Sequence, residues 1–258
     1  MISTKKSAPR SAKKATAASK TLWLPDSIKN VSGDEKWANE VIFDLHETIV
    51  NWGGTIANIA KQMYPHSNFD PNKMGFYNAG FDPGCNLNPY EWEMVLIQSL
   101  THGVYGQLPL VDKDIRAQMW RIAKAGTRCR IATHVPGASD ISHTDKIPIH
   151  TNVAQRLTLE LIKRHDLPVD IDRDVEFIYP SRKKDFMAER YIPLIIEDNI
   201  ETAAGVATYA HACILVPKSY NAGFKCPNVL RLDNRAELDT RVIAFFKELK
   251  RLNLLRPY

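Results

Sequence analysis

The chain has 258 residues, of which 44% are hydrophobic, and its formal net charge is +5. This length and composition allow one sizeable domain with a hydrophobic core. No apolar run approaches the roughly 18 residues that a membrane-spanning helix needs, so we expect no membrane-embedded segment.

The charge is concentrated at the N-terminus. Residues 1–20 contain six Lys or Arg and no acidic residue, whereas the rest of the chain is close to neutral. This Ser/Ala/Lys-rich stretch lacks the apolar residues needed to fold, so residues 1–22 are predicted to be a disordered basic tail. A solubilising role for the tail is favoured over weak contact with a nucleic-acid backbone.

Four cysteines are scattered without a C-x-x-C spacing. This predicts neither disulfides nor a zinc site and favours a cytoplasmic location.

After the basic tail, short β-branched apolar segments alternate with amphipathic helical patterns. This alternation predicts an α/β fold, a doubly wound and mostly parallel Rossmann-like sheet. The predicted strands are 41–45, 129–133, 175–179, 194–198 and 212–216, and the predicted helices after the first strand are 89–103, 112–126, 151–165 and 235–253.

The alternation is interrupted once, between the first two predicted strands. Some eighty residues separate them, far more than an ordinary crossover uses, and the middle of this stretch is rich in Pro, Gly, Asn and aromatic residues. We therefore predict a small helical cap inserted at 51–107, while 23–50 and 108–258 form the core domain.

Polar residues follow four of the predicted strands. Because ligands bind beyond the carboxyl ends of strands in an open parallel sheet, these residues are expected to share one site. Carboxylates at two strand ends, with a hydroxyl and a cation at two others, suit a phosphoryl group held with Mg²⁺, and a carboxylate can attack phosphorus covalently. The structural alternative, Asp44 as a helix cap and Thr133 as a core threonine, explains each residue alone but not the ordered set.

The four segments "VIFDLHET", "IATH", "SRKKD" and "LIIEDN" resemble, in this order, the motifs of the haloacid dehalogenase superfamily. The resemblance implies that Asp44 is the nucleophile and a Mg²⁺ ligand. It also implies that the backbone carbonyl of His46 and the side chain of Asp198 are further ligands, with Glu197 supporting the metal site.

The same resemblance implies a substrate-binding set around the phosphoryl group. Thr133, followed by His134, would bind the phosphoryl oxygens, and Lys184 would neutralise the aspartyl-phosphate, with Lys183 as the alternative. Trp52, just past the first motif, is a candidate to line the pocket. The cap length and the segment "IIEDNIETAAG" look similar to the 5′(3′)-deoxyribonucleotidases, which implies a small phosphomonoester substrate such as a deoxynucleoside monophosphate.

His46 departs from the superfamily pattern, in which phosphatases usually have an Asp that protonates the leaving group and then activates water. An imidazole with a pKa near 6.5 could perform both transfers, or the acid/base could have been lost, and the sequence leaves both possibilities open. Two other functions remain as alternatives: a phosphatase acting on polynucleotide ends, and a degenerate member that binds a nucleotide or a partner without turnover.

Overall fold

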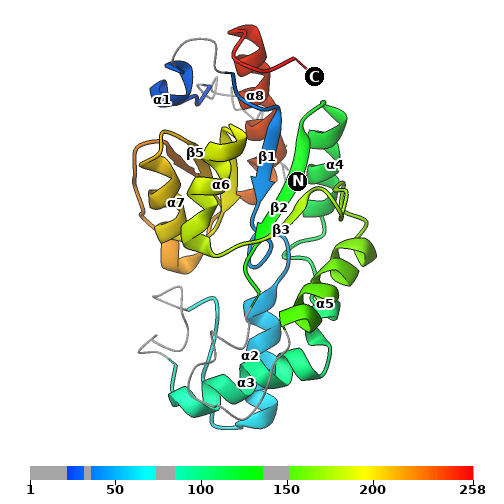
Figure 1. The fold of residues 1–258 in the computed structure, drawn as a ribbon. Coiled ribbons are helices and arrows are strands. Elements are labelled where there is room, and N and C mark those ends of the chain that lie inside the picture. The colour runs from blue at the N-terminus through cyan, green and yellow to red at the C-terminus, as the bar shows by residue number, and fades with distance from the viewer. Residues whose placement is uncertain (1–21, 32–35, 74–84, 136–150, 258) are drawn as a thin grey trace, which may run out of the picture.

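Six parallel strands form the centre of the computed structural model, which describes residues 22–31, 36–73, 85–135 and 151–257 (Figure 1). The predicted basic tail lies almost entirely outside the described residues. The strands are β1 Glu40–Phe43, β2 Arg128–Thr133, β3 Val175–Phe177, β4 Leu194–Glu197, β5 Ala212–Leu215 and β6 Val229–Arg231.

The strand order is β3-β2-β1-β4-β5-β6, and every pairing within this sheet is parallel. This is the order of a doubly wound Rossmann-like fold, so the predicted fold class is confirmed. The five predicted strands are all present, and β6 is an additional edge strand that the sequence pattern did not reveal. The chain reverses its direction of travel across the sheet between β1 and β4, which is where ligands bind in such folds.

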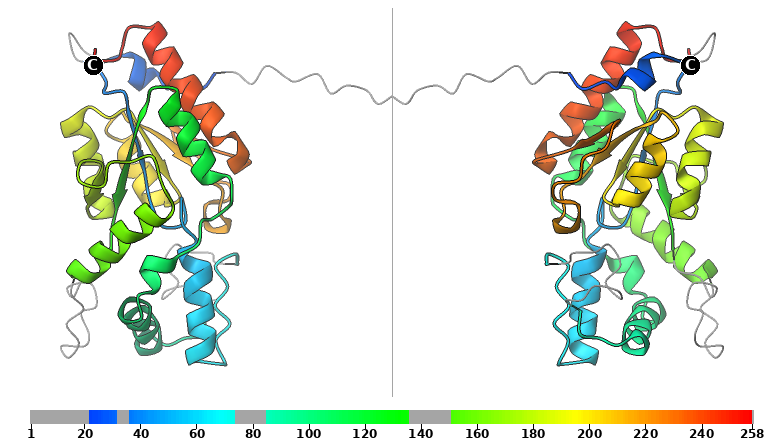
Figure 2. Two further views of the ribbon diagram at one scale, coloured as in Figure 1. Left: turned by 90° about the vertical axis from the view of Figure 1, so that its right-hand side faces the viewer. Right: turned by 90° about the vertical axis from the view of Figure 1, so that its left-hand side faces the viewer.

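Helices cover both faces of the sheet (Figures 1 and 2). Successive residues of β1 point to opposite faces, so Val41 and Phe43 belong to the larger apolar cluster with α4, α5 and α8, and Ile42 to the smaller one with α6 and α7. The described helices are α1 Asp26–Lys29, α2 Trp52–Met63, α3 Pro89–Thr101, α4 Ile115–Lys124, α5 Thr151–Arg164, α6 Lys183–Arg190, α7 Ile200–Ala207 and α8 Leu238–Arg251. No helix within the described ranges is both long and apolar enough to cross a bilayer.

Helices α2 and α3 lie beyond the carboxyl ends of the strands (Figures 1 and 2). Helix α2 begins after Asn51, whose side chain accepts the Gly54 N–H at 2.9 Å, and α3 begins with a reciprocal capping box between Asn88 and Glu91. The two helices share an apolar cluster of their own, while Tyr105 just after α3 packs into the main cluster. The expected cap at 51–107 and the division into tail, core and cap stay a proposal.

His211 is buried at the start of β5, with 2% of its surface exposed. Its Nδ1–H donates to the carbonyl oxygen of Ile192 at 3.0 Å, and its ring meets Trp37 edge-on. Burial lowers the pKa of His211 to about 4, with the hydrogen bond to Ile192 acting in the opposite direction. The neutral imidazole is therefore the form that the fold accommodates.

We expect this histidine to make the fold sensitive to acid. Between about pH 6.5 and pH 4 the unfolded chain binds a proton on this imidazole that the folded chain excludes, so the free energy of unfolding decreases as pH falls through this window, by at most about 1.4 kcal/mol per pH unit. His211→Asn keeps the donor and removes the titration. Urea unfolding at several pH values should give a shallower acid slope for the variant, and equal slopes would contradict the assignment.

Candidate active site

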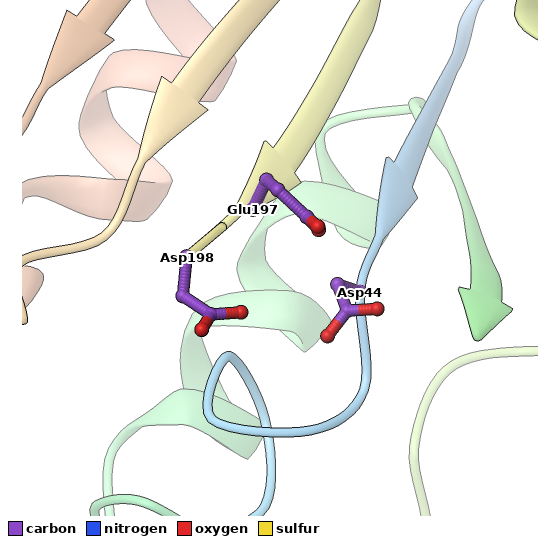
Figure 3. Close-up of side chains that lie close together, drawn as sticks. All are labelled: Asp44, Glu197 and Asp198. Atoms are coloured by element: carbon purple, nitrogen blue, oxygen red, sulfur yellow. The ribbon is translucent and has the colours of Figure 1, made fainter. Parts of the chain in front are cut away.

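Three buried carboxylates meet at the carboxyl ends of β1 and β4 (Figure 3). Asp44 directly follows β1, Glu197 is the last residue of β4, and Asp198 comes next. One oxygen from each carboxylate lies within 4.8 Å of the others, and each residue is at most 7% exposed. The sheet brings them together because β1 and β4 are hydrogen-bonded neighbours at the point where the strand order reverses.

Lys183, the first residue of α6, is buried against two of these carboxylates. Its Nζ donates to Asp44 Oδ1 at 2.5 Å and to Glu197 Oε2 at 3.2 Å. Burial opposes the charged ammonium, but the negative charges of Asp44 and Glu197 outweigh it and raise the pKa of Lys183 above its ordinary value. The lysine is therefore charged at neutral pH.

Lys184 does not join this cluster, which corrects the residue preferred from the sequence. Its Nζ lies 4.8 Å from the centre of the Tyr209 ring. Consecutive residues of a helix point about 100° apart, so only one of two adjacent lysines can face the carboxylates. The structure places Lys183, the alternative, beside Asp44.

Asp198 is held by Thr48, the last residue of the first motif, and by two residues that carried no sequence signal, Tyr220 and Asn221. The Thr48 hydroxyl donates to Asp198 Oδ1 at 3.3 Å, the Tyr220 hydroxyl donates to Oδ2, and the Asn221 side chain donates to the Asp198 backbone carbonyl at 2.9 Å. Burial raises the pKa of Asp198 to about 7, and the charge of Asp44 acts in the same direction, while the Tyr220 hydrogen bond opposes both. Tyr220 and Asn221 follow β5. The one signal in the sequence was that β5, like β1 and β4, ends on the side of the sheet where the carboxylates lie.

The cluster suits a divalent cation. Three buried carboxylates face one lysine, and burial, followed by the charges of Asp44 and Asp198, raises the pKa of Glu197 well above its usual range despite the opposing charge of Lys183. This excess negative charge is costly in a buried site, and a hard cation would offset it. Mg²⁺ prefers carboxylate and carbonyl oxygens, so the donor set fits the expected metal.

The loop after β1 has a conformation fixed by its neighbours. Glu47 has φ +58°, in the left-handed region that favours glycine. Glu47 Oε1 accepts the Gly53 N–H at 2.5 Å, and its other oxygen pairs with Lys218. Arg235 donates to the carbonyl oxygens of Thr48 at 2.9 Å and Glu47 at 2.6 Å, so the loop is held on both sides.

His46 packs against aromatic side chains. Its ring centre lies 5.4 Å from that of Tyr105 and 6.2 Å from that of Trp52, whose Nε1–H donates to the Tyr105 hydroxyl at 3.0 Å. The His46 Nε2 atom is buried and has no hydrogen-bond partner among the described residues. Burial lowers the pKa of His46 to about 4, although the charge of Asp44 opposes the shift. His46 is therefore neutral at pH 7. Trp52 lies beside it, and the role of Trp52 in lining a substrate pocket stays a prediction.

Thr133 and His134 lie at the end of β2, next to β1. Thr133 is fully buried, and its hydroxyl donates to the His134 carbonyl oxygen at 3.4 Å. The His134 ring stacks on Tyr179 with the ring centres 4.7 Å apart. Both residues thus lie at the carboxyl ends of the strands, where the acidic cluster lies. Their contact with a phosphoryl group stays a prediction.

No family model matches the chain, and no curated protein matches it. Among solved structures it is similar to a HAD family hydrolase from Deinococcus radiodurans with bound phosphate and sodium, at 14% identity and a TM-score of 0.48, covering 87% of this chain and 100% of that chain. A haloacid dehalogenase-like hydrolase from Xanthomonas campestris gives 13% identity and a TM-score of 0.49, with 86% and 97% covered. CbbY from Rhodobacter sphaeroides in complex with phosphate gives 15% identity and a TM-score of 0.46, with 78% and 96% covered.

Proposed function

We propose that this protein is a Mg²⁺-dependent phosphomonoester hydrolase of the haloacid dehalogenase type, acting through a phosphorylated Asp44. The observation that carries the proposal is the buried contact of Asp44 with Lys183 at the end of the central strand, next to Glu197 and Asp198. A nucleophilic carboxylate, a fixed cation and a carboxylate pair for a metal are what phosphoryl transfer to an aspartate requires.

In this proposal an oxygen of Asp44 forms a bond to phosphorus while the ester P–O bond breaks, and the leaving alkoxide takes up a proton from solvent water. Water then cleaves the aspartyl-phosphate, releasing phosphate and restoring the carboxylate. Lys183 stabilises the negative charge of the phosphoryl oxygens throughout. The Asp44 and Asp198 side chains and the His46 backbone carbonyl would hold Mg²⁺, which supplies Lewis-acid neutralisation of phosphoryl charge.

The substrate we propose is a small phosphomonoester such as a deoxynucleoside monophosphate. Trp52 is partly exposed beside His46 and presents an aromatic surface next to the loop that carries the nucleophile. Such a surface could stack on a base. Within the proposal, Trp52 is a substrate-positioning residue.

His46 favours one rival, a member that binds its ligand with little or no turnover. A neutral imidazole with a lowered pKa is a poor proton donor at pH 7, and its ring is occupied by contacts with Trp52 and Tyr105. Esters whose leaving group needs a proton should therefore react slowly. Aryl esters, whose leaving group departs as a stable anion, should react faster.

The experiment is a measurement of released phosphate in Mg²⁺ and in chelator, with p-nitrophenyl phosphate and a deoxynucleoside 5′-monophosphate as substrates. We expect wild type to prefer the aryl ester and to lose both activities in chelator. His46→Asp should accelerate the nucleotide reaction by about 10²–10⁴-fold and the aryl ester less, because a carboxylic acid can protonate the leaving alkoxide. His46→Asn is the matched control, because Asn has the same size as Asp but cannot donate a carboxylic acid proton. It should give no acceleration of the nucleotide reaction.

Two results would contradict this account. No phosphate release from either ester, by wild type or His46→Asp in Mg²⁺, would leave a binding protein in place of a hydrolase. The second result is fast hydrolysis of the nucleotide by wild type, together with loss of this activity over the whole pH range in His46→Ala. It would show that His46 is a working acid/base.

A further inference from the structure

A cleft with an excess of positive charge lies beside the loop that carries the proposed nucleophile. Its volume is about 420 Å³, within the range of small-molecule sites. Among the described residues that line it, three are cations, Lys218, Arg231 and Arg235, and one, Glu47, has a carboxylate. The loops after β1 and β5, the last residue of β6 and the turn before α8 contribute these side chains.

Of the cations in the cleft, Lys218 has a carboxylate partner and Arg231 has only uncharged partners. Lys218 forms an ion pair with Glu47, so these two groups compensate each other. Arg231 donates to oxygens of Asn221, Leu232 and Lys218, all of them uncharged acceptors, and no carboxylate pairs with its guanidinium among the described residues.

Arg235 is in a similar position. Its Nη1 and Nη2 each donate to one backbone carbonyl oxygen, which leaves Nε–H and one further N–H on each Nη without an acceptor in the described part of the chain. Burial lowers the pKa of Arg235, and the charges of Asp198, Asp112 and Glu47 act against this shift. Two guanidinium groups with unused donors in one cleft are suited to a planar or tetrahedral oxyanion.

Thr48 connects the cleft with the acidic cluster. The Thr48 hydroxyl donates to Asp198, and the Thr48 carbonyl oxygen accepts from Arg235. Lys218 belongs to the segment after β5 that also contains Tyr220, the partner of Asp198. An anion in the cleft would therefore be bound next to the site where the scissile phosphoryl group is expected.

We infer that this cleft is a second phosphate-binding site, in which Arg231 and Arg235 donate to a phosphate group other than the one that is hydrolysed. That group is either the distal phosphate of a bisphosphorylated substrate or a free phosphate that acts as an effector. The existence of the phosphate-binding site does not depend on the proposed hydrolase function. The choice between a substrate phosphate and an effector phosphate rests on that function.

The first test is phosphate binding in the presence of chelator, measured by calorimetry with inorganic phosphate on the full chain. Chelator removes divalent cations that would recruit phosphate to the acidic cluster, and weaker binding by Arg231→Gln then assigns the bound phosphate to the cleft. We expect wild type to bind and Arg231→Gln to bind at least about 10-fold more weakly, the change expected from losing one charged donor pair. Arg231→Lys retains the charge and should lose less.

Arg116→Gln is the matched control, since Arg116 pairs with Asp166 on the exposed side of α4. It should bind phosphate as wild type does, and circular dichroism of all variants verifies that each is folded. Absence of phosphate binding by wild type in chelator, or equal affinity in wild type and folded Arg231→Gln, would overturn the proposal whether or not the protein is a phosphatase.

The second arm distinguishes the two sources of the phosphate group. With Mg²⁺, kcat/KM for a deoxynucleoside 3′,5′-bisphosphate is compared with that for the 5′-monophosphate. A preference for the bisphosphate that falls about 10-fold in Arg231→Gln assigns the cleft to the substrate. If binding in chelator depends on Arg231 but no such preference exists, the cleft holds a separate phosphate.

Discussion

Asp44→Asn is expected to abolish phosphate release, by on the order of 10⁴-fold or more, because the amide is neither a nucleophile nor a good Mg²⁺ ligand. The substitution conserves size at a position that is 7% exposed, so packing around the side chain is retained. It also removes one of three mutually repelling carboxylates, while Glu197 remains as a partner for Lys183. Phosphate release in Mg²⁺ and thermal unfolding of the same sample give the two readouts.

The result that would remove Asp44 from the mechanism is turnover by the folded variant at a rate near that of wild type. A matched control is Asp70→Asn, since Asp70 lies in the 51–107 segment and its carboxylate accepts a backbone N–H from Asn72. This control should keep wild-type activity, which would show that loss of a carboxylate in general is not sufficient.

Lys183→Met is expected to reduce kcat/KM by about 10²–10³-fold, the usual effect of removing one group that stabilises transition-state charge. Methionine fills most of the buried volume but leaves Asp44 and Glu197 without their cation. Breaking a buried pair in this way costs about 3–5 kcal/mol of folding free energy, so a lower melting temperature should accompany the kinetic loss.

Lys184→Met provides the comparison, because it differs by one position and by about 100° around helix α6. The ammonium of Lys184 lies over the Tyr209 ring, whereas the ammonium that donates to Asp44 is that of Lys183, so the loss of Lys184 should change kcat/KM by less than about 3-fold. Equal damage from the two substitutions would contradict the placement of Lys183 as the cation of the site.

The sequence was informative wherever burial leaves a repeating pattern. Val41, Ile42 and Phe43 are buried on both faces of the sheet, so β1 appears as a continuous apolar run, and Asp44 is marked as the first polar residue after it. The same reasoning located Glu197 and the adjacent Asp198 at the end of β4. Strands β3 and β6 both have three partly exposed residues at an edge of the sheet. The apolar residues Ile178 and Tyr179 extend the pattern of β3, whereas only Leu232 extends that of β6, so β6 was missed.

Other parts of the candidate site could not be predicted for physical reasons. Adjacent lysines in the first turn of a helix give no indication of which one faces inward, because that depends on the rotation of α6 against the sheet. Tyr220 and Arg235 lie in short connections without periodicity, so their contacts with Asp198 and with the loop after β1 depend on tertiary packing alone. The lowered pKa of His46 likewise reflects its burial beside Trp52 and Tyr105.

The central place of β1 in the sheet affects how the protein is made. Val41 pairs with Cys129 on one side and with Leu194 on the other, so β1 is synthesised long before either neighbour. Closing such long loops is entropically costly, and sheets that depend on it fold slowly. Until residues near 194 have been synthesised, a nascent chain carries an apolar strand with an unpaired edge, and this segment is a potential origin of aggregation during synthesis.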